Sequence, residues 1–194
     1  MPERKFALRP WRMEDAAALP ALAGDLEVAR WLRDVFPHPY TRSDAEDFLR
    51  LCCGADEDQA LYRAVTVDGQ VAGSMALTRG RDVYQKSAEL GYWLGRPFWG
   101  RGLGTWAAEA LCREGFRRWD IVRVYAGPYA DNLASRRLLE KTGFRLEGVL
   151  RHSVWKLGEL KDSCVYGLLR EEWAERLSRG REEQDGEERD LCLK

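Results

Sequence analysis

The feature that most constrains the fold is a glycine-rich segment near the middle of the chain, Trp99-Gly-Arg-Gly-Leu-Gly-Thr105. It lies between a run of strand-forming residues, 88–94, and a run with helical spacing that starts at Leu103. Successive glycines let several backbone N–H groups turn toward one point, and the start of a helix adds its positive end. The segment therefore predicts a strand–loop–helix unit that binds an anion such as a pyrophosphate.

Two better-known glycine motifs do not fit this segment. A Walker loop needs Gly-Lys-Ser or Gly-Lys-Thr, and the chain has neither. A dinucleotide fingerprint needs G-x-G-x-x-G, whereas the segment reads G-x-G-x-G, and Asp120 precedes the next predicted strand instead of following it. The remaining alternative is a turn whose glycines serve only tight packing between the strand and the helix.

Composition excludes several classes of protein. With 194 residues, 45% of them hydrophobic, the chain is long enough for one domain with its own core, so a disordered or collagen-like chain is excluded. Its 31 Lys+Arg and 32 Asp+Glu give no extended basic field, so we expect neither nucleic acid nor a membrane surface as a partner. A local patch remains, because residues 96–141 hold nine basic against five acidic side chains.

The cysteines and the N-terminus suggest a cytoplasmic protein. Five cysteines are an odd number without C-x-x-C spacing, and the two histidines lie far from most of them in sequence, so we expect reduced thiols and no metal site. The first residues lack an apolar leader, and no apolar run approaches the ~18 residues that a membrane span needs. We therefore expect a soluble, cytoplasmic protein.

Hydrophobic periodicity and turn signals predict a chain of mixed helices and strands. Asp68-Gly69 is typical of a tight hairpin, Ser43 and Glu46 form a capping box, and Asp131 or Asn132 should cap a helix that ends at Gly143. The predicted strands are 6–9, 61–67, 70–77, 88–94, 121–126, 144–151 and 163–169, and the predicted helices are 13–23, a short one holding Val28, Trp31 and Leu32, 43–53, one from 103, 132–142 and 171–177.

Four motifs in order along the chain resemble the GNAT superfamily of N-acetyltransferases, and within it the RimJ/RimL branch, which acetylates N-terminal amines of ribosomal proteins. The resemblance covers about residues 6–177. Its motifs are Pro39-Tyr40-Thr41; Glu89-Leu-Gly-Tyr-Trp-Leu94 leading into the glycine segment and Glu109-Ala110; Asp131-Asn-Leu-Ala-Ser135 followed by Leu138-Leu-Glu-Lys-Thr-Gly-Phe144 and Glu147-Gly148; and Tyr166-Gly-Leu-Leu-Arg-Glu-Glu-Trp173.

The resemblance implies an α/β (α+β) fold: a mixed, mostly antiparallel sheet with flanking helices, splayed between strands 88–94 and 121–126. Acetyl-CoA would lie in the gap of a GNAT domain spanning residues 1–177, followed by a charged tail, 178–194. The backbone of Trp93 and Leu94 would pair with the pantetheine arm. The implied cofactor-binding residues are Trp93, Leu94, Trp99, Gly100, Arg101, Gly102, Leu103, Gly104, Thr105, Asn132, Ser135 and Arg137.

Amide formation requires the acceptor amine to lose a proton, so a carboxylate near the thioester is expected. Glu89 is the candidate base; its alternative role is an ion pair with a nearby Lys or Arg. The resemblance places Ser135 at the departing sulfur and Asn132 at the pantetheine chain, although Asn132 could simply cap the helix and Ser135 could be a polar residue of its first turn. A backbone N–H near Trp93 or Leu94 could polarise the thioester carbonyl, and Tyr129 is a second candidate donor for it. Arg101 and Arg137 are better phosphate candidates than Arg136 and Lys141.

Acceptor contacts are expected from two variable segments, one with Trp31, Phe36 and Tyr40 and the other with Trp155 and its neighbour Lys156. The resemblance implies direct acetyl transfer from acetyl-CoA to a primary amine, and the branch implies a protein N-terminal α-amine as the leading acceptor. A polyamine, amino acid or aminoglycoside acceptor is one alternative, and an acidic pocket would favour the polyamine. A non-catalytic acetyl-CoA sensor is another, and a homodimer is left open.

Overall fold

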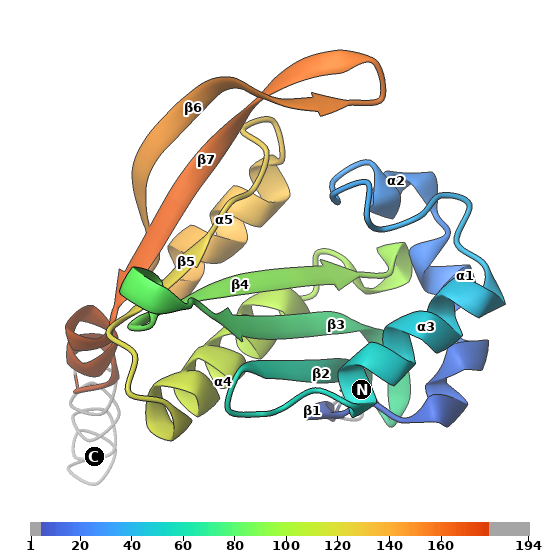
Figure 1. The fold of residues 1–194 in the computed structure, drawn as a ribbon, viewed down its shortest axis with the longest axis horizontal. Coiled ribbons are helices and arrows are strands. Elements are labelled where there is room, and N and C mark those ends of the chain that lie inside the picture. Colours follow the sequence, from blue (N-terminus) through green and yellow to red (C-terminus); the bar gives the residue numbers. More distant parts are fainter. Residues whose placement is uncertain (1–4, 179–194) are drawn as a thin grey trace, which may run out of the picture.

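The computed structural model describes residues 5–178, so the predicted tail lies outside the described residues apart from Ser178. Seven strands form one sheet in the order β1-β2-β3-β4-β5-β7-β6 (Figure 1). The elements are β1 (Phe6–Pro10), η1 (Met13–Ala17), α1 (Leu19–Ala23), α2 (Leu26–Ala29), α3 (Arg42–Cys53), β2 (Ala60–Val67), β3 (Gln70–Arg79), η2 (Asp82–Tyr84), β4 (Ser87–Leu94), η3 (Arg96–Phe98), α4 (Leu103–Arg118), β5 (Arg123–Ala126), α5 (Leu133–Thr142), β6 (Arg145–Lys156) and β7 (Glu159–Leu169). Residues 170–178 are helical.

The sheet opens between β4 and β5. Every other neighbouring pair is antiparallel, whereas β4 and β5 run parallel and pair only from Ser87↔Arg123 to Glu89↔Tyr125. Beyond Glu89 the two strands diverge, and Figure 1 shows the long β6–β7 hairpin rising away from β2, β3 and β4. The splayed, mostly antiparallel sheet implied by the family resemblance is therefore confirmed.

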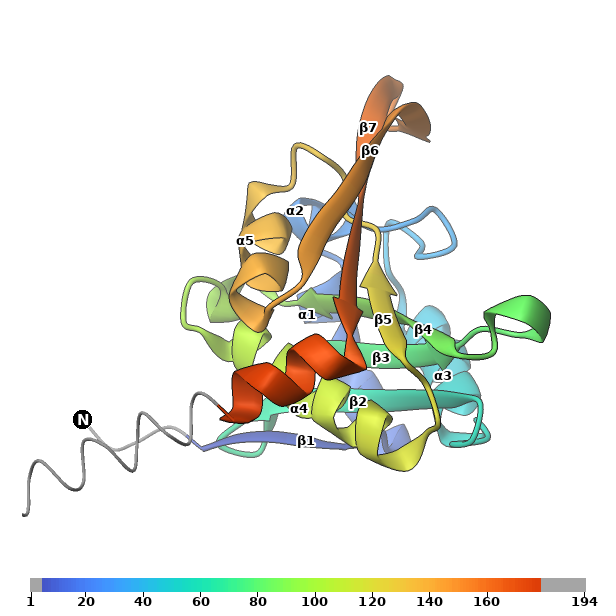
Figure 2. The same cartoon turned by 90° about the vertical axis from the view of Figure 1, so that its left-hand side faces the viewer.

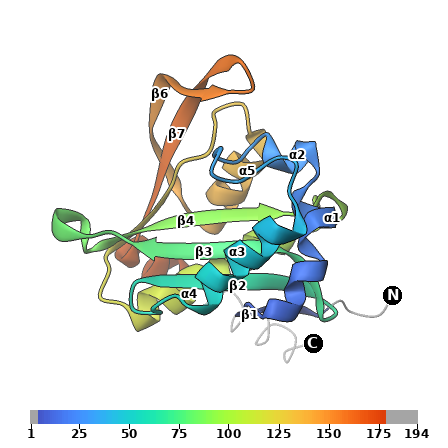
Figure 3. The same cartoon turned by 45° about the vertical axis from the view of Figure 1, so that its right-hand side comes forward.

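Two apolar clusters cover the two faces of the sheet. The larger one packs α4, including Leu103, Ala107 and Leu111, against the strands. The smaller one joins η1, α1 and α3 to the opposite face through residues such as Leu19, Leu49 and Trp93. Figures 2 and 3 show α3 and α4 on opposite sides of the sheet. Because successive strand residues point to opposite faces, β4 presents alternate side chains to the two layers.

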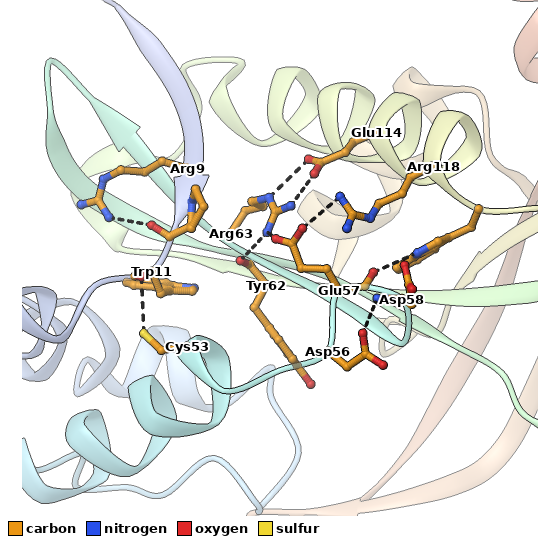
Figure 4. A network of polar contacts seen from close by, with 12 residues as sticks. Arg9, Trp11, Cys53, Asp56, Glu57, Asp58, Tyr62, Arg63, Glu114 and Arg118 are labelled. Carbon is orange, nitrogen blue, oxygen red and sulfur yellow. Dashed lines mark hydrogen bonds and ion pairs between the residues drawn. The ribbon is translucent and has the colours of Figure 1, made fainter.

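A buried ion-pair network ties the strand layer to α4 (Figure 4). Arg63 on β2 is only 6% exposed, and its guanidinium pairs with Glu57 at 2.9 Å and with Glu114 of α4. Arg118, one turn further along α4, also reaches Glu57 at 3.0 Å. A buried guanidinium needs such partners, so this network fixes how α4 lies on β2.

The N-terminal helices differ from the prediction. The expected helix 13–23 is divided into a 3-10 helix and α1, with Pro20 in the first turn of α1. Proline has no N–H to donate to the preceding turn, so a helix restarts around it and does not run through it. The next helix ends at Ala29, which leaves Trp31 and Leu32 in the segment that follows.

The capping box of α3 lies two residues earlier than predicted. Thr41, and not Ser43, is the N-cap: its hydroxyl accepts from the Asp44 N–H at 3.3 Å, and the Asp44 carboxylate accepts from the Thr41 N–H at 2.7 Å. Thr41 has the extended backbone of an N-cap residue, whereas Ser43 is already inside the helix.

The turns and strand ends agree more closely with the prediction. Asp68 and Gly69 both have positive φ, as a tight hairpin requires, and Gly143 ends α5 in the left-handed region. β5 starts at Arg123, later than predicted, while β6 and β7 continue to a turn at Leu157-Gly158. Among residues 5–178, none of the helices combines the length and apolar character that a membrane crossing needs.

Candidate functional site

A cavity of about 820 Å³ occupies the gap where β4 and β5 diverge. Its walls come from the exposed edge of β4, the glycine segment, the first turns of α5, the residues after α2 and the end of the β6–β7 hairpin. In Figure 1 the hairpin tip reaches over toward α2, so segments far apart in the sequence enclose one opening. The cavity has two ends, which differ in construction.

The glycine segment forms one end of the cavity, and residues 99–105 all line it. Gly100 and Gly102 have φ values of 69° and 75°, in the left-handed region that side-chain-bearing residues rarely adopt. A Cβ on either would meet nothing within 4 Å, so packing does not require glycine there. Gly104 differs, because its Cβ would lie 2.5 Å from the Leu138 Cδ1 of α5. Tight packing therefore explains one of these glycines, and backbone conformation explains the other two.

Cationic side chains gather at the same end. Arg101, Arg137 and Lys141 line the cavity. Arg136 does not: its guanidinium donates to the Tyr166 hydroxyl and to the Ala130 carbonyl, each at 3.1 Å. Three cations beside the start of a sixteen-residue helix create a positive local field suited to a compact phosphate group.

The open edge of β4 offers unpaired peptide groups, but not those of Trp93. At the two ends of the β3–β4 ladder, Gly95 N–H donates to the Ala72 carbonyl and Gly80 N–H donates to the Ser87 carbonyl, both at 2.8 Å. Because hydrogen-bonded pairs alternate in an antiparallel ladder, the peptide groups of Trp93 face β3, and those of its two neighbours face the gap. Trp93 lines the cavity, but its peptide groups pair with β3, contrary to the expectation that they would pair with the pantetheine arm.

One gap-facing carbonyl is already used. The Trp99 indole Nε1 donates to the Leu94 carbonyl at 2.7 Å, which ties the glycine segment to the end of β4. Trp99 therefore has a structural role in this turn. Of the two neighbours, Tyr92 keeps its peptide groups open toward the cavity.

The first turn of α5 brings Asn132 and Ser135 to the cavity wall. Asn132 caps the helix, since its Oδ1 accepts from the Ser135 N–H at 3.1 Å, and its amide nitrogen is not needed for the cap. The Ser135 Oγ lies 2.6 Å from the Tyr92 hydroxyl. Burial raises the pKa of Tyr92, so this phenol stays protonated. Sequence reasoning missed Tyr92, because an aromatic residue in a strand is typical of a core.

Glu89 lies on the other side of β4 and faces the second end of the cavity. The Arg33 Nη2 lies 3.2 Å from its Oε1, so the ion pair considered as an alternative to catalysis is present. The Arg33 side chain is 76% exposed, and a pair so open to water is weak and separable. The carboxylate therefore remains accessible to a group that enters the cavity.

Residues 32–34, which we call the cross-gap segment, close this second end. Leu32 accepts a hydrogen bond at its carbonyl from the Tyr129 hydroxyl at 3.2 Å, and Arg33 pairs with Glu89 on β4. Asp34 pairs with the Lys156 Nζ on β6 at 2.6 Å. Three consecutive residues thus contact both sides of the splayed sheet.

The predicted acceptor residues separate into two pairs. Trp31 and Trp155 line the cavity. Phe36 and Tyr40 do not line it; their rings stack at 4.9 Å, and Phe36 also meets the Trp93 ring edge-on at 5.9 Å. Both belong to the apolar cluster over α1 and α3. In residues 5–178, no group of three or more His, Cys, Asp or Glu side chains is arranged to hold a metal ion.

Comparison with known proteins gives a consistent family. Residues 5–145 match the model of the acetyltransferase (GNAT) domain. The uncharacterized N-acetyltransferase p20 of Bacillus licheniformis is 30% identical over 174 residues, 88% of this chain and 96% of p20. The spermidine N(1)-acetyltransferase of Escherichia coli strain K12 is 28% identical over 166 residues, 82% and 84% of the two chains. Mycobacterium smegmatis RimJ, solved in complex with CoA-disulfide, superposes with a TM-score of 0.76 at 26% identity, covering 90% of this chain and 88% of RimJ.

Proposed function

This chain belongs to the GNAT acetyltransferase family and is an acetyl-CoA-dependent acetyltransferase, and from that premise we propose that its acceptor is the α-amine of a protein N-terminus. The observation that carries the proposal is the charge of the cavity wall. Five cationic side chains line the cavity, namely Arg33, Arg101, Arg137, Lys141 and Lys156, against two carboxylates, those of Asp34 and Glu89.

Each of those carboxylates already has a cationic partner. Arg33 pairs with Glu89, and Lys156 pairs with Asp34. A polyamine carries several positive charges and would meet no surplus of negative charge in this wall. A peptide N-terminus brings a single amine, and to reach the Glu89 carboxylate this amine has to displace only one cation, the exposed Arg33. The resemblance of the sequence motifs to the RimJ/RimL branch also supports a protein acceptor, while the likeness to a spermidine acetyltransferase makes the polyamine the alternative to test.

The residues at the glycine end fit coenzyme A. A backbone turn that two left-handed glycines make possible, three cations and a helix start suit the pyrophosphate, so we assign its binding to residues 99–105 with Arg137. The open peptide groups of Tyr92 and the Asn132 amide suit the pantetheine arm, which can pair with them as an added strand would. When bound, acetyl-CoA supplies an acetyl thioester that an amine can attack.

Two side chains divide the proton chemistry. Glu89 accepts the proton that the amine must lose, directly or through a water molecule. An α-amine, with a pKa of about 8, gives up that proton more readily than a lysine side chain, at about 10.4. Ser135, on the other wall, donates a hydrogen bond to the sulfur. None of the four described cysteines lines the cavity, which favours direct attack over an acetylated enzyme thiol.

The test is thiol release from acetyl-CoA with a panel of acceptors. The panel holds peptides with a free N-terminus, the same peptides blocked at the α-amine but carrying a lysine, spermidine, free amino acids and an aminoglycoside. We expect turnover with the free N-termini alone, and fragment mass spectra that locate the acetyl group on the α-amine. Faster turnover with spermidine would overturn the proposed acceptor, and silence across the panel would favour a sensor.

A further inference from the structure

The geometry points to Tyr92 as a positioning residue for Ser135. We propose that the Tyr92 hydroxyl donates to the Ser135 Oγ and thereby aims the serine's own hydrogen at the sulfur of coenzyme A. The inference rests on the role assigned to Ser135 under the proposed function, but not on the identity of the acceptor. It gives a function to a cavity-lining phenol that the chemistry above does not use.

The two hydroxyls meet across the cavity wall. Tyr92 comes from β4 and Ser135 from the first turn of α5, 43 positions later, and both line the cavity. Their oxygens are 2.6 Å apart, which is a short hydrogen bond between two hydroxyls. The Tyr92 hydroxyl is also 3.4 Å from the Ser135 carbonyl, a much longer contact.

Counting hydrogens decides the direction of this bond. Each hydroxyl carries one hydrogen. If Ser135 donated to Tyr92, the phenol hydrogen would have only the 3.4 Å carbonyl contact, and the serine would have no hydrogen left for the sulfur. If Tyr92 donates, it makes the 2.6 Å bond, and the serine hydrogen is free to point into the cavity. Burial keeps this phenol protonated, which agrees with the donor role.

The rest of Ser135 is already fixed. Its N–H donates to the Asn132 Oδ1 at 3.1 Å, so the helix cap sets the serine backbone. The orientation of the hydroxyl is the freedom that remains, and Tyr92 removes it. A donor held in place before the charge develops stabilises a thiolate more than one that must first reorient.

The other cavity tyrosine does not offer this contact. The Tyr129 hydroxyl donates to the Leu32 carbonyl of the cross-gap segment at 3.2 Å. It is therefore engaged at the acceptor end, whereas Tyr92 is engaged at Ser135. The two tyrosines form a matched pair for experiment, because each can lose one hydroxyl in the same cavity.

The experiment measures the pKa of the coenzyme A thiol bound to the protein, without an acceptor. The thiolate absorbance of the coenzyme A complex, minus that of the desulfo-coenzyme A complex, is followed across pH for the wild type, Tyr92→Phe and Tyr129→Phe. A hydrogen bond to the thiolate lowers its pKa. We expect Tyr92→Phe to lower the acid dissociation constant of the bound thiol about tenfold, and Tyr129→Phe to leave this constant unchanged.

Ser135→Ala provides the second arm. It should raise the bound thiol pKa at least as much as Tyr92→Phe, and the double variant should add nothing further, because Tyr92 acts through Ser135. Melting temperatures show whether each variant keeps its fold. An unchanged thiol pKa in Tyr92→Phe, an equal shift in Tyr129→Phe, or additive shifts in the double variant would overturn the proposal. Since no acceptor is present, a wrong acceptor assignment does not alter this result.

Discussion

The two ends of the cavity are built in different ways. Seven consecutive residues, 99–105, form the core of the glycine end, and their shape follows from left-handed glycines and the start of α4. The acceptor end is assembled from the cross-gap segment, Glu89 on β4, Tyr129 and the hairpin tip, with partners up to 122 positions apart. Because the two ends are built from largely different segments, a substitution at one end can leave the other unchanged.

The largest effect should come from the acceptor end. Glu89→Gln removes the proposed base but keeps the size of the side chain, so kcat should fall about 100-fold or more. Stopped-flow or steady-state thiol release measures it, and calorimetry with acetyl-CoA should give a Kd close to that of the wild type. If kcat is unchanged, Glu89 is only the ion-pair partner of Arg33.

The glycine end is tested by Gly102→Val. A β-branched residue at a φ of 75° is strained by about 1–2 kcal/mol, so the backbone turn should open and the Kd for acetyl-CoA should rise about tenfold or more. Gly69→Val is the matched control: Gly69 has a φ of 83° and equally open surroundings, but it lies in the β2–β3 hairpin. Both should lower the melting temperature, and only Gly102→Val should weaken cofactor binding. Equal effects on Kd would contradict a specific role for the turn.

The cross-gap segment is tested by an asymmetric pair of variants. The Asp34 side chain is 80% exposed, while the Lys156 side chain is 6% exposed. Asp34→Ala leaves a buried ammonium without its partner, at a cost of about 1–3 kcal/mol, whereas Lys156→Met leaves only a carboxylate in water. The acceptor KM should therefore rise about fivefold to tenfold in Asp34→Ala and less in Lys156→Met. The reverse order would show that this ion pair does not hold the segment.

The smallest effect concerns a site remote from both ends. Arg9 and Asp15 form a bidentate pair at 2.7 and 2.8 Å. Burial by itself would raise the pKa of Asp15, but the hydrogen bonds from the Arg9 guanidinium and the Arg12 N–H, together with the charges of both arginines, outweigh it and the pKa is lowered. The pair therefore stabilises the fold above the unfolded-state pKa of Asp15, and the contribution is lost as pH falls through the folded-state pKa. Asp15→Asn should lower the free energy of unfolding near neutral pH by about 1 kcal/mol, as measured by denaturant unfolding. The free energy of unfolding of this variant should also fall less steeply as the solution becomes acidic, while kcat and Kd stay unchanged.

Local patterns in the sequence predicted what local geometry determines. The glycine turn, the Asp68-Gly69 hairpin, the Asn132 cap and the Gly143 end of α5 each depend on a few adjacent residues, and each is present. The exception is α3, where Thr41-x-x-Asp44 and Ser43-x-x-Glu46 are equivalent as patterns. The position at which the chain leaves its extended conformation decides between them.

Contacts across the gap could not be predicted in this way. Tyr92 and Ser135, Arg33 and Glu89, and Lys156 and Asp34 become partners only when the sheet splays and the hairpin reaches the cross-gap segment. The same holds for Phe36 and Tyr40, which the sequence suggested for the acceptor: the structure buries Tyr40 in the apolar cluster over α1 and α3 and packs Phe36 against that cluster. Long-range packing, and not residue type, sets these positions.

If the two ends of the cavity act independently, a calorimetric titration with acetyl-CoA should separate their variants. The wild type, Gly102→Val and Asp34→Ala are compared under the same conditions. We expect a Kd raised about tenfold or more in Gly102→Val and a wild-type Kd in Asp34→Ala. A comparable loss of affinity in both variants, or none in Gly102→Val, would contradict this expectation.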